Sequence, residues 1–161
     1  MPDVPPAPQP AQWSCYLRAV VDIAFPTRTL RVAPGTAPRG VPGLPYPLAG
    51  GQTIHIVTAF DPAGRATPPE ANLRAQHALH DHIRATGRQW WPAVGGDRAG
   101  THSEVSAAVA GWDDLQARAL GRQFGQDAVF AWSPTAWRLL ACTPAVLDAP
   151  PADWHATLLR P

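Results

Sequence analysis

A strand, a turn and a helix in direct succession constrain the fold of this chain most. Residues 53–60 form an apolar run rich in β-branched side chains, which is typical of a central strand. The Asp-Pro-Ala-Gly turn at 61–64 ends that run. The Thr-Pro-Pro-Glu segment at 67–70 has the pattern of a capping box with proline in the first turn, and predicts a helix to about Thr86, which Gly87 ends. This unit favours helices packed on a β-sheet.

Similar patterns predict further strands and a second main helix. Alternation over residues 17–25 favours a half-buried strand, with 29–33 as its hairpin partner. Asp113 or Asp114 is expected to cap a helix that Gly125 ends. We therefore expect a single α/β domain, with α+β as the alternative, built on a mixed β-sheet of about six or seven strands with two main helices packed on it. The other predicted strands are 88–94, 104–110, 128–132 and 136–142.

The two ends of the chain differ from this domain in composition. Residues 1–12 contain five prolines and show no apolar periodicity, which predicts a disordered tail. We place the α/β domain at 13–142. Residues 143–161 are then a C-terminal extension that could hold a short helix near Trp154.

Charge and composition exclude several classes of function. The formal net charge is +1, too small for the basic surface that nucleic-acid binding usually requires, so nucleic acid is not an expected partner. All 13 cationic side chains are arginine, so no lysine is present to form a Schiff base or a phosphate-binding loop. No apolar run is long enough to span a bilayer and the N-terminus lacks the pattern of a signal peptide, which predicts a cytoplasmic protein with no membrane partner. Cys15 and Cys142 are expected to be separate thiols.

Candidate site residues gather around the predicted end of strand 53–60. Asp61 is either a carboxylate at the mouth of a crevice or the first residue of an Asx-turn. Asn72 lies on the helix face expected to pack on the sheet, so its amide either bonds nearby backbone or contacts a ligand. Thr58 and Gln126 are further candidates for ligand binding. The amide of Gln126 could instead close the loop around it.

His102 and Glu104 are the strongest candidates for chemistry. Alternation places both on one face if the strand starts at His102. They could form an acid/base couple or supply two ligands of a metal site completed by Asp61. Alternatively, Glu104 is a surface residue at a strand start that pairs with an arginine. We predict that Glu104 faces the same cleft as Asp61 and Asn72. If that cleft is catalytic, burial and the like charge should raise the pKa of Glu104.

Three segments carry a resemblance to a known family. They are residues 56–62 with Thr-Ala-Phe-Asp-Pro, residues 95–104 with Gly-Gly-Asp and Glu104, and residues 120–128 with Phe-Gly-Gln. With Asn72 between them, the chain over residues 16–142 resembles a bacterial family known only as domain of unknown function 3293. Asp61 stands where asparagine is usual, and His102 where tryptophan is usual. The family name carries no activity, so the resemblance implies no catalytic residue.

Together these observations predict a small protein with a polar pocket at one sheet edge. The first hypothesis is a module that binds a small molecule or a protein. The alternative is a small hydrolase that uses His102, Glu104 and Asp61, with or without a metal ion. The sequence leaves open whether the protein is an enzyme, assigns no cofactor and selects no residue as a metal ligand.

Overall fold

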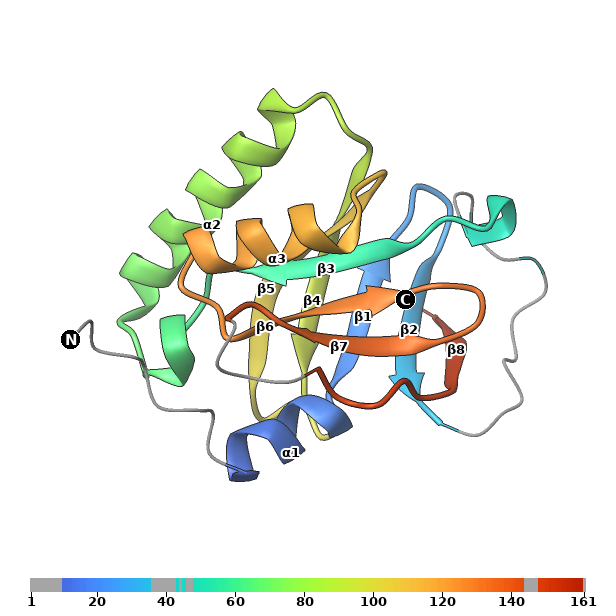
Figure 1. Cartoon of the computed structure of the whole chain (residues 1–161), viewed down its shortest axis with the longest axis horizontal. Coiled ribbons are helices and arrows are strands. Elements are labelled where there is room, and N and C mark those ends of the chain that lie inside the picture. Colours follow the sequence, from blue (N-terminus) through green and yellow to red (C-terminus); the bar gives the residue numbers. More distant parts are fainter. Residues whose placement is uncertain (1–9, 36–42, 44, 46–47, 144–147, 161) are drawn as a thin grey trace.

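The described residues form one curled sheet of eight strands with three α-helices (Figure 1). The structure is a computed structural model that describes residues 10–35, 43, 45, 48–143 and 148–160. Two short 3-10 turns, Leu48–Gly50 and Pro62–Gly64, flank the third strand. The elements in chain order are α1 (Pro10–Arg18), β1 (Val20–Ala24), β2 (Thr29–Pro34), β3 (Ile54–Thr58), α2 (Pro69–Ala85), β4 (Trp90–Gly96), β5 (Ser103–Ala110), α3 (Asp114–Gln123), β6 (Ala128–Trp132), β7 (Trp137–Ala141) and β8 (Trp154–Leu159).

The strand order is β7-β6-β3-β5-β4-β1-β2-β8, and each pair of neighbours is antiparallel. Helix α2 connects β3 to β4 across β5, and α3 connects β5 to β6 across β3. Each helix therefore joins two strands that run in the same direction but are separated by an antiparallel strand between them. The segment from β3 to β6 is thus a split β-α-β arrangement, β-α-β-β-α-β, extended by β1, β2 and β8 on one side and β7 on the other.

The sheet curls until its two edges come close together. A bridge joins Trp137 of β7 to Ala152, which lies just before β8, through hydrogen bonds of 2.8 and 2.9 Å between their backbones. The indole rings of Trp132 and Trp154 meet edge to face, with centroids 5.2 Å apart. Because β7 and β8 lie at opposite ends of the strand order, these contacts enclose an interior between them.

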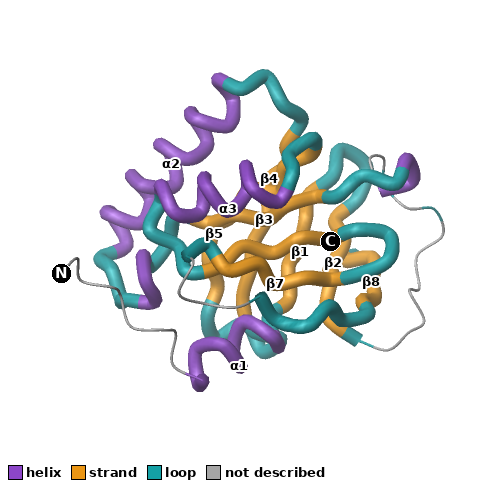
Figure 2. The backbone as a smooth tube through the Cα atoms, in the orientation of Figure 1, coloured by secondary structure: helices purple, strands orange, loops and turns teal. Residues whose placement is uncertain are grey.

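Alternation along the strands divides the apolar core between the two faces of the sheet. Helices α2 and α3 cover the outer face (Figure 2), where side chains such as Val57 pack against Leu79 and Leu120. The inner face holds the larger cluster, which fills much of the enclosed interior. Its largest members are Ile23, Phe25, Leu30, Leu48, Ile54, Ile56, Trp91, Trp132, Trp137 and Trp154.

The structure confirms much of the predicted architecture. The α/β class, the two main helices and the strands around them are present, and the two cysteines are unpaired thiols. Asp113 caps α3 in a capping box with Gln116, and α2 ends just before Gly87. Among the described residues, no helix combines the length and apolar character that crossing a membrane requires.

Five details of the prediction are wrong. The sheet has eight strands rather than six or seven, and its neighbouring pairs are antiparallel rather than mixed. Residues 10–12 of the predicted tail begin α1, while residues 1–9 lie outside the described part. Residues 154–159 form β8 instead of a short helix, because they pair with β2. Thr67 does not cap α2, since its hydroxyl donates to the carbonyl of Arg65 and Pro68 occupies the cap position.

Candidate functional site

A pocket of about 850 Å³ opens on the inner face of the sheet, beneath α1. It lies where β3 and β4 end and β5 and β6 begin, and α1 contributes Cys15 to Arg18 to its wall. Most of the wall is apolar, with Val21, Ile56 and Phe130 among its side chains. A volume of this size fits a small organic molecule. The polar candidates that line the pocket are Thr58, Asp61, His102, Glu104 and Gln126.

Asp61 is held in an unusual backbone conformation directly after β3. Its φ of 45° lies in the left-handed region, which Asp and Asn tolerate better than most residues. The amide of Asn72 donates to Asp61 Oδ1 at 2.9 Å, and Asn72 Oδ1 accepts from the Asp61 backbone N–H at 2.9 Å. Asp61 Oδ1 also accepts from the Thr67 N–H at 3.1 Å. Asn72 is buried, and the first of its two expected roles, bonding to nearby backbone, is confirmed. Its side chain also fixes the Asp61 carboxylate.

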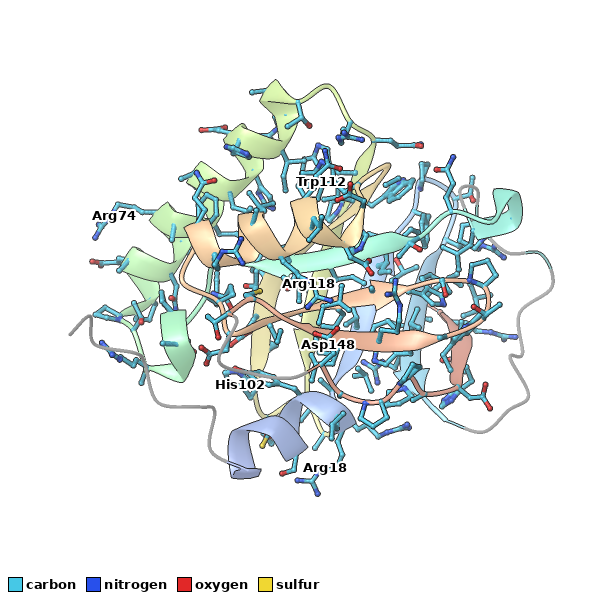
Figure 3. The ribbon with its side chains drawn as sticks, viewed as in Figure 1. Arg18, Arg74, His102, Trp112, Arg118 and Asp148 are labelled. Carbon is cyan, nitrogen blue, oxygen red and sulfur yellow. The ribbon has the colours of Figure 1, made fainter. Side chains whose placement is uncertain are left out.

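The turn between β4 and β5 carries His102. Asp97 organises this turn, because its carboxylate accepts from the backbone and the hydroxyl of Thr101 and its N–H donates to the carbonyl of His102 at 3.2 Å. Gly96 allows the close approach of the two strands: a Cβ at this position would lie 2.2 Å from the carbonyl oxygen of His102. The Gly-Gly-Asp motif therefore builds the hairpin that positions His102 (Figure 3).

Asp61, His102 and Glu104 converge at the polar end of the pocket. One ligand atom from each lies within 4.8 Å of the others. His102 Nε2 is 3.2 Å from Glu104 Oε1, and the two side chains are 61% and 25% exposed. The register explains this meeting, since Thr58 at the end of β3 pairs with Ser106 of β5, two residues after Glu104. Glu104 and Asp61 thus face the same cleft, as predicted, whereas Asn72 does not line it.

The environment of Glu104 makes its carboxyl group harder to ionise than usual. Burial raises the pKa of Glu104 above its usual value, and the negative charge of Asp61 raises it further, against the opposing effect of His102. The predicted direction is confirmed. Tyr16 of α1 lies in the same pocket, and burial, with the charges of Asp127 and Glu104, raises its pKa to about 12. Its phenol is therefore neutral at pH 7.

The other two candidates, Thr58 and Gln126, line the pocket, but their side chains donate hydrogen bonds to backbone carbonyls of the fold. The hydroxyl of Thr58 donates to the carbonyl of Val105 at 2.7 Å. The amide of Gln126 donates to the carbonyl of Phe60 at 3.0 Å, which closes the loop next to Asp61. Both residues shape the site through these bonds. Their role toward a ligand stays a prediction.

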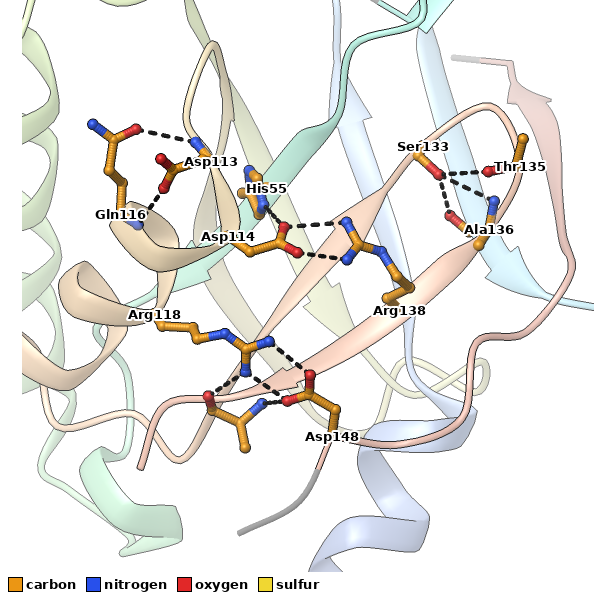
Figure 4. Close-up of polar contacts among 11 residues, drawn as sticks. His55, Asp113, Asp114, Gln116, Arg118, Ser133, Thr135, Ala136, Arg138 and Asp148 are labelled. Carbon is orange, nitrogen blue, oxygen red and sulfur yellow. Dashed lines mark hydrogen bonds and ion pairs between the residues drawn. The ribbon is translucent and has the colours of Figure 1, made fainter. Parts of the chain in front are cut away.

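A second polar group, which the sequence analysis missed, lies on the outer face under α3 (Figure 4). His55 of β3 is fully buried, and its Nε2 is 2.9 Å from Asp114 Oδ1. Arg138 of β7 donates two hydrogen bonds to the same carboxylate. A histidine inside the apolar run of 53–60 was the signal that could have revealed this group. Its burial indicates a role in joining β3, α3 and β7.

The protonation states in this group follow from burial and pairing. Burial lowers the pKa of His55, and this effect outweighs the hydrogen bond to Asp114. Burial acts to raise the pKa of Asp114, but the hydrogen bonds from Arg138 and His55 outweigh it and lower that pKa. His55 is therefore neutral at pH 7 and donates from Nε2, which leaves Nδ1 as an acceptor. This atom has no hydrogen-bond partner among the described residues.

Comparison with known proteins gives a match to one family model and no activity. Residues 57–129 match the model of the family described as "Protein of unknown function (DUF3293)", which confirms the resemblance seen in the sequence. The matched segment runs from β3 into β6 and covers the split β-α-β arrangement together with Asp61, Asn72, His102, Glu104 and Gln126. No curated protein matches the chain, and no solved structure does.

Proposed function

We propose that this protein binds a small organic molecule in the pocket beneath α1. The ligand has an apolar body and, at one end, a group that is cationic or donates hydrogen bonds. The observation that supports this is the convergence of Asp61, His102 and Glu104 at one end of an otherwise largely apolar pocket of about 850 Å³. Because both cysteines are free, the proposal includes a reducing, cytoplasmic location.

The pocket has an apolar wall and a polar end, and these two parts determine the kind of ligand that we propose. Apolar side chains from β1, β3 and β6 line the body of the pocket. Binding an apolar group there is favourable, because it removes apolar surface of both the protein and the ligand from water. The two carboxylates at the end of the pocket disfavour an anionic group there and favour a donor or a cation. A protein partner fits less well, because the pocket is a concavity rather than an extended surface.

A pocket-filling substitution tests the proposal. A Cβ at Gly95 would meet Ser106 Oγ at 3.7 Å, an ordinary contact, so Gly95→Leu places its side chain in the pocket without disturbing β4. The wild type should bind the apolar fluorophore N-phenylnaphthylamine at one site, and Gly95→Leu should abolish the fluorescence increase. Val94→Leu is the matched control, because Val94 is exposed and points to the other face of the same strand. Equal binding by all three proteins would refute the proposal.

Hydrolysis is the second candidate function, because His102 and Glu104 are in contact beside Asp61 and the pKa of Glu104 is raised. A panel of nitrophenyl esters and phosphates tests it directly. Any turnover should fall by about 100-fold or more in Glu104→Gln, the lower range for losing a general acid or base, with the melting temperature unchanged. Full turnover in this variant, or none in the wild type, would remove this candidate.

A further inference from the structure

We propose that Asp61, His102 and Glu104 bind a divalent transition-metal ion at the polar end of the pocket. The inference rests on the proposed pocket and changes the chemistry of its polar end: with the ion bound, that end would accept an electron-pair donor of the small molecule in place of a cationic group. Its test nevertheless uses the metal alone.

The three side chains come from three elements that the fold brings together. Asp61 follows β3, His102 lies in the turn between β4 and β5, and Glu104 lies near the start of β5. Their candidate ligand atoms lie within 4.8 Å of one another. Ligands held about 2.1 Å from one ion lie about 3 to 4 Å apart, so the side chains need to close by only about 1 Å.

The surroundings of Asp61 match those of a positioned metal ligand. Its Oδ1 accepts hydrogen bonds from the Asn72 amide and the Thr67 N–H, whereas no described residue donates to Oδ2. Supporting bonds of this kind orient a ligating carboxylate and leave the second oxygen for the ion. Within the described part of the chain, the Glu104 carboxyl group likewise uses only Oε1, in its contact with His102.

No arginine of the described residues forms an ion pair with the carboxylates of Asp61 and Glu104. Two carboxylates face each other, and among the ion pairs of the described residues only His102 contacts either of them. Arg18 and Arg98 line the pocket, but neither forms an ion pair with Asp61 or Glu104. A doubly charged ion would offset the repulsion and replace the water lost from Glu104.

The ligand set selects the class of ion. One imidazole and two carboxylates suit Zn²⁺, Mn²⁺ or Fe²⁺, whereas Ca²⁺ and Mg²⁺ prefer oxygen ligands alone. Three protein ligands leave coordination positions open toward the pocket, as in metal sites that bind a small molecule. The set differs from a closed structural site, which uses four protein ligands.

Calorimetric titration of the chelator-treated protein with Zn²⁺ and, separately, Mn²⁺ tests the proposal. We expect one ion per chain for at least one of the two metals. Glu104→Gln and His102→Ala should each weaken binding by more than about tenfold, the smallest effect seen when only a supporting residue is lost. Circular dichroism should show that both variants remain folded, since His102 is exposed and glutamine preserves the shape of Glu104.

His77→Ala is the control for binding at surface histidines, because His77 is exposed on α2. It should leave affinity and stoichiometry unchanged. Absence of saturable binding for both ions, or binding that survives both Glu104→Gln and His102→Ala, would overturn the proposal. N-phenylnaphthylamine binding that persists in either case would leave the pocket function standing, so the two failures are distinguishable.

Discussion

At the scale of single residues, many motif positions hold the site together without facing a ligand. Asn72 fixes the Asp61 carboxylate, and Asp97 shapes the turn that carries His102. The Phe-Gly-Gln segment acts on the same loop, since the carbonyl of Gly125 accepts from the Ala63 N–H at 2.8 Å. Asp61 itself adopts a left-handed φ that asparagine also tolerates, which accounts physically for either residue at this position.

Gly125 should be among the least replaceable residues of this loop. Its φ of 72° favours glycine, and a Cβ there would lie 2.9 Å from the Cβ of Pro62. Gly87 follows α2 as Gly125 follows α3, with a φ of 69°, but a Cβ there meets no atom within 4 Å. We predict that Gly87→Ala costs about 1 kcal/mol from backbone conformation alone, and that Gly125→Ala costs more because Pro62 must also move.

Urea denaturation of the two variants measures the difference between these positions. The excess loss in Gly125→Ala reports the contact between the end of α3 and the Asp61 turn. Equal losses would show that this contact does not constrain the loop.

At the scale of elements, local patterns predicted the helices and strands between β3 and β7 well. There, the apolar alternation, the Asp113 cap and the glycines after α2 and α3 all agree with the fold. The failures lie at the ends. Leu17 and Ala19 fit the alternation of the first strand, although Leu17 belongs to α1. Residues 154–159 pair with β2, more than a hundred positions earlier, and no local pattern reports such a distant partner.

The direction of neighbouring strands was also beyond local reasoning. Each helix connects two parallel strands, as the order of elements suggests. A third, antiparallel strand lies between the two in the sheet: β5 between β3 and β4, and β3 between β5 and β6. β5 inserts between β3 and β4, and its register then places Glu104 beside the end of β3. The position of β5 between β3 and β4 therefore has two consequences. It makes the neighbouring strands antiparallel, contrary to the predicted mixed sheet, and it builds the candidate site.

At the scale of the whole molecule, the two faces of the sheet have different roles. The inner face forms the pocket, and the outer face packs on α2 and α3. The grouping of Asp61, His102 and Glu104 followed from sequence because each residue borders a turn or a strand end. The His55 group did not, because a histidine within a buried strand acquires its partners only when α3 and β7 pack over it.

The buried His55 should make the stability of the whole molecule depend on pH. Burial lowers the pKa of His55 in the folded chain, so below about pH 6.5 the unfolded chain binds a proton that the folded chain does not. The free energy of unfolding should therefore fall as the pH drops from about 6.5 toward the lowered pKa. Above about pH 6.5, both states are neutral at this residue and the effect vanishes.

The charged groups that face His55 are Asp114 and Arg138, with Asp113 nearby. The pKa of Asp114 lies below its usual value of 3.8, so its contribution to stability is lost only under more acidic conditions. His80, whose pKa is also lowered, acts in the same direction as His55, whereas the raised pKa of Glu104 acts in the opposite direction. A comparison at matched pH is therefore needed to separate His55 from the rest.

His55→Gln makes that comparison, because a glutamine amide can still donate to Asp114 and carries no titratable proton. Urea denaturation of both proteins at about pH 7.5 and about pH 5 should show a larger loss of unfolding free energy for the wild type. The difference between the two losses is the contribution of His55. Equal losses would mean that His55 gains its proton in the folded state as readily as in the unfolded chain, and that its bond to Asp114 outweighs its burial.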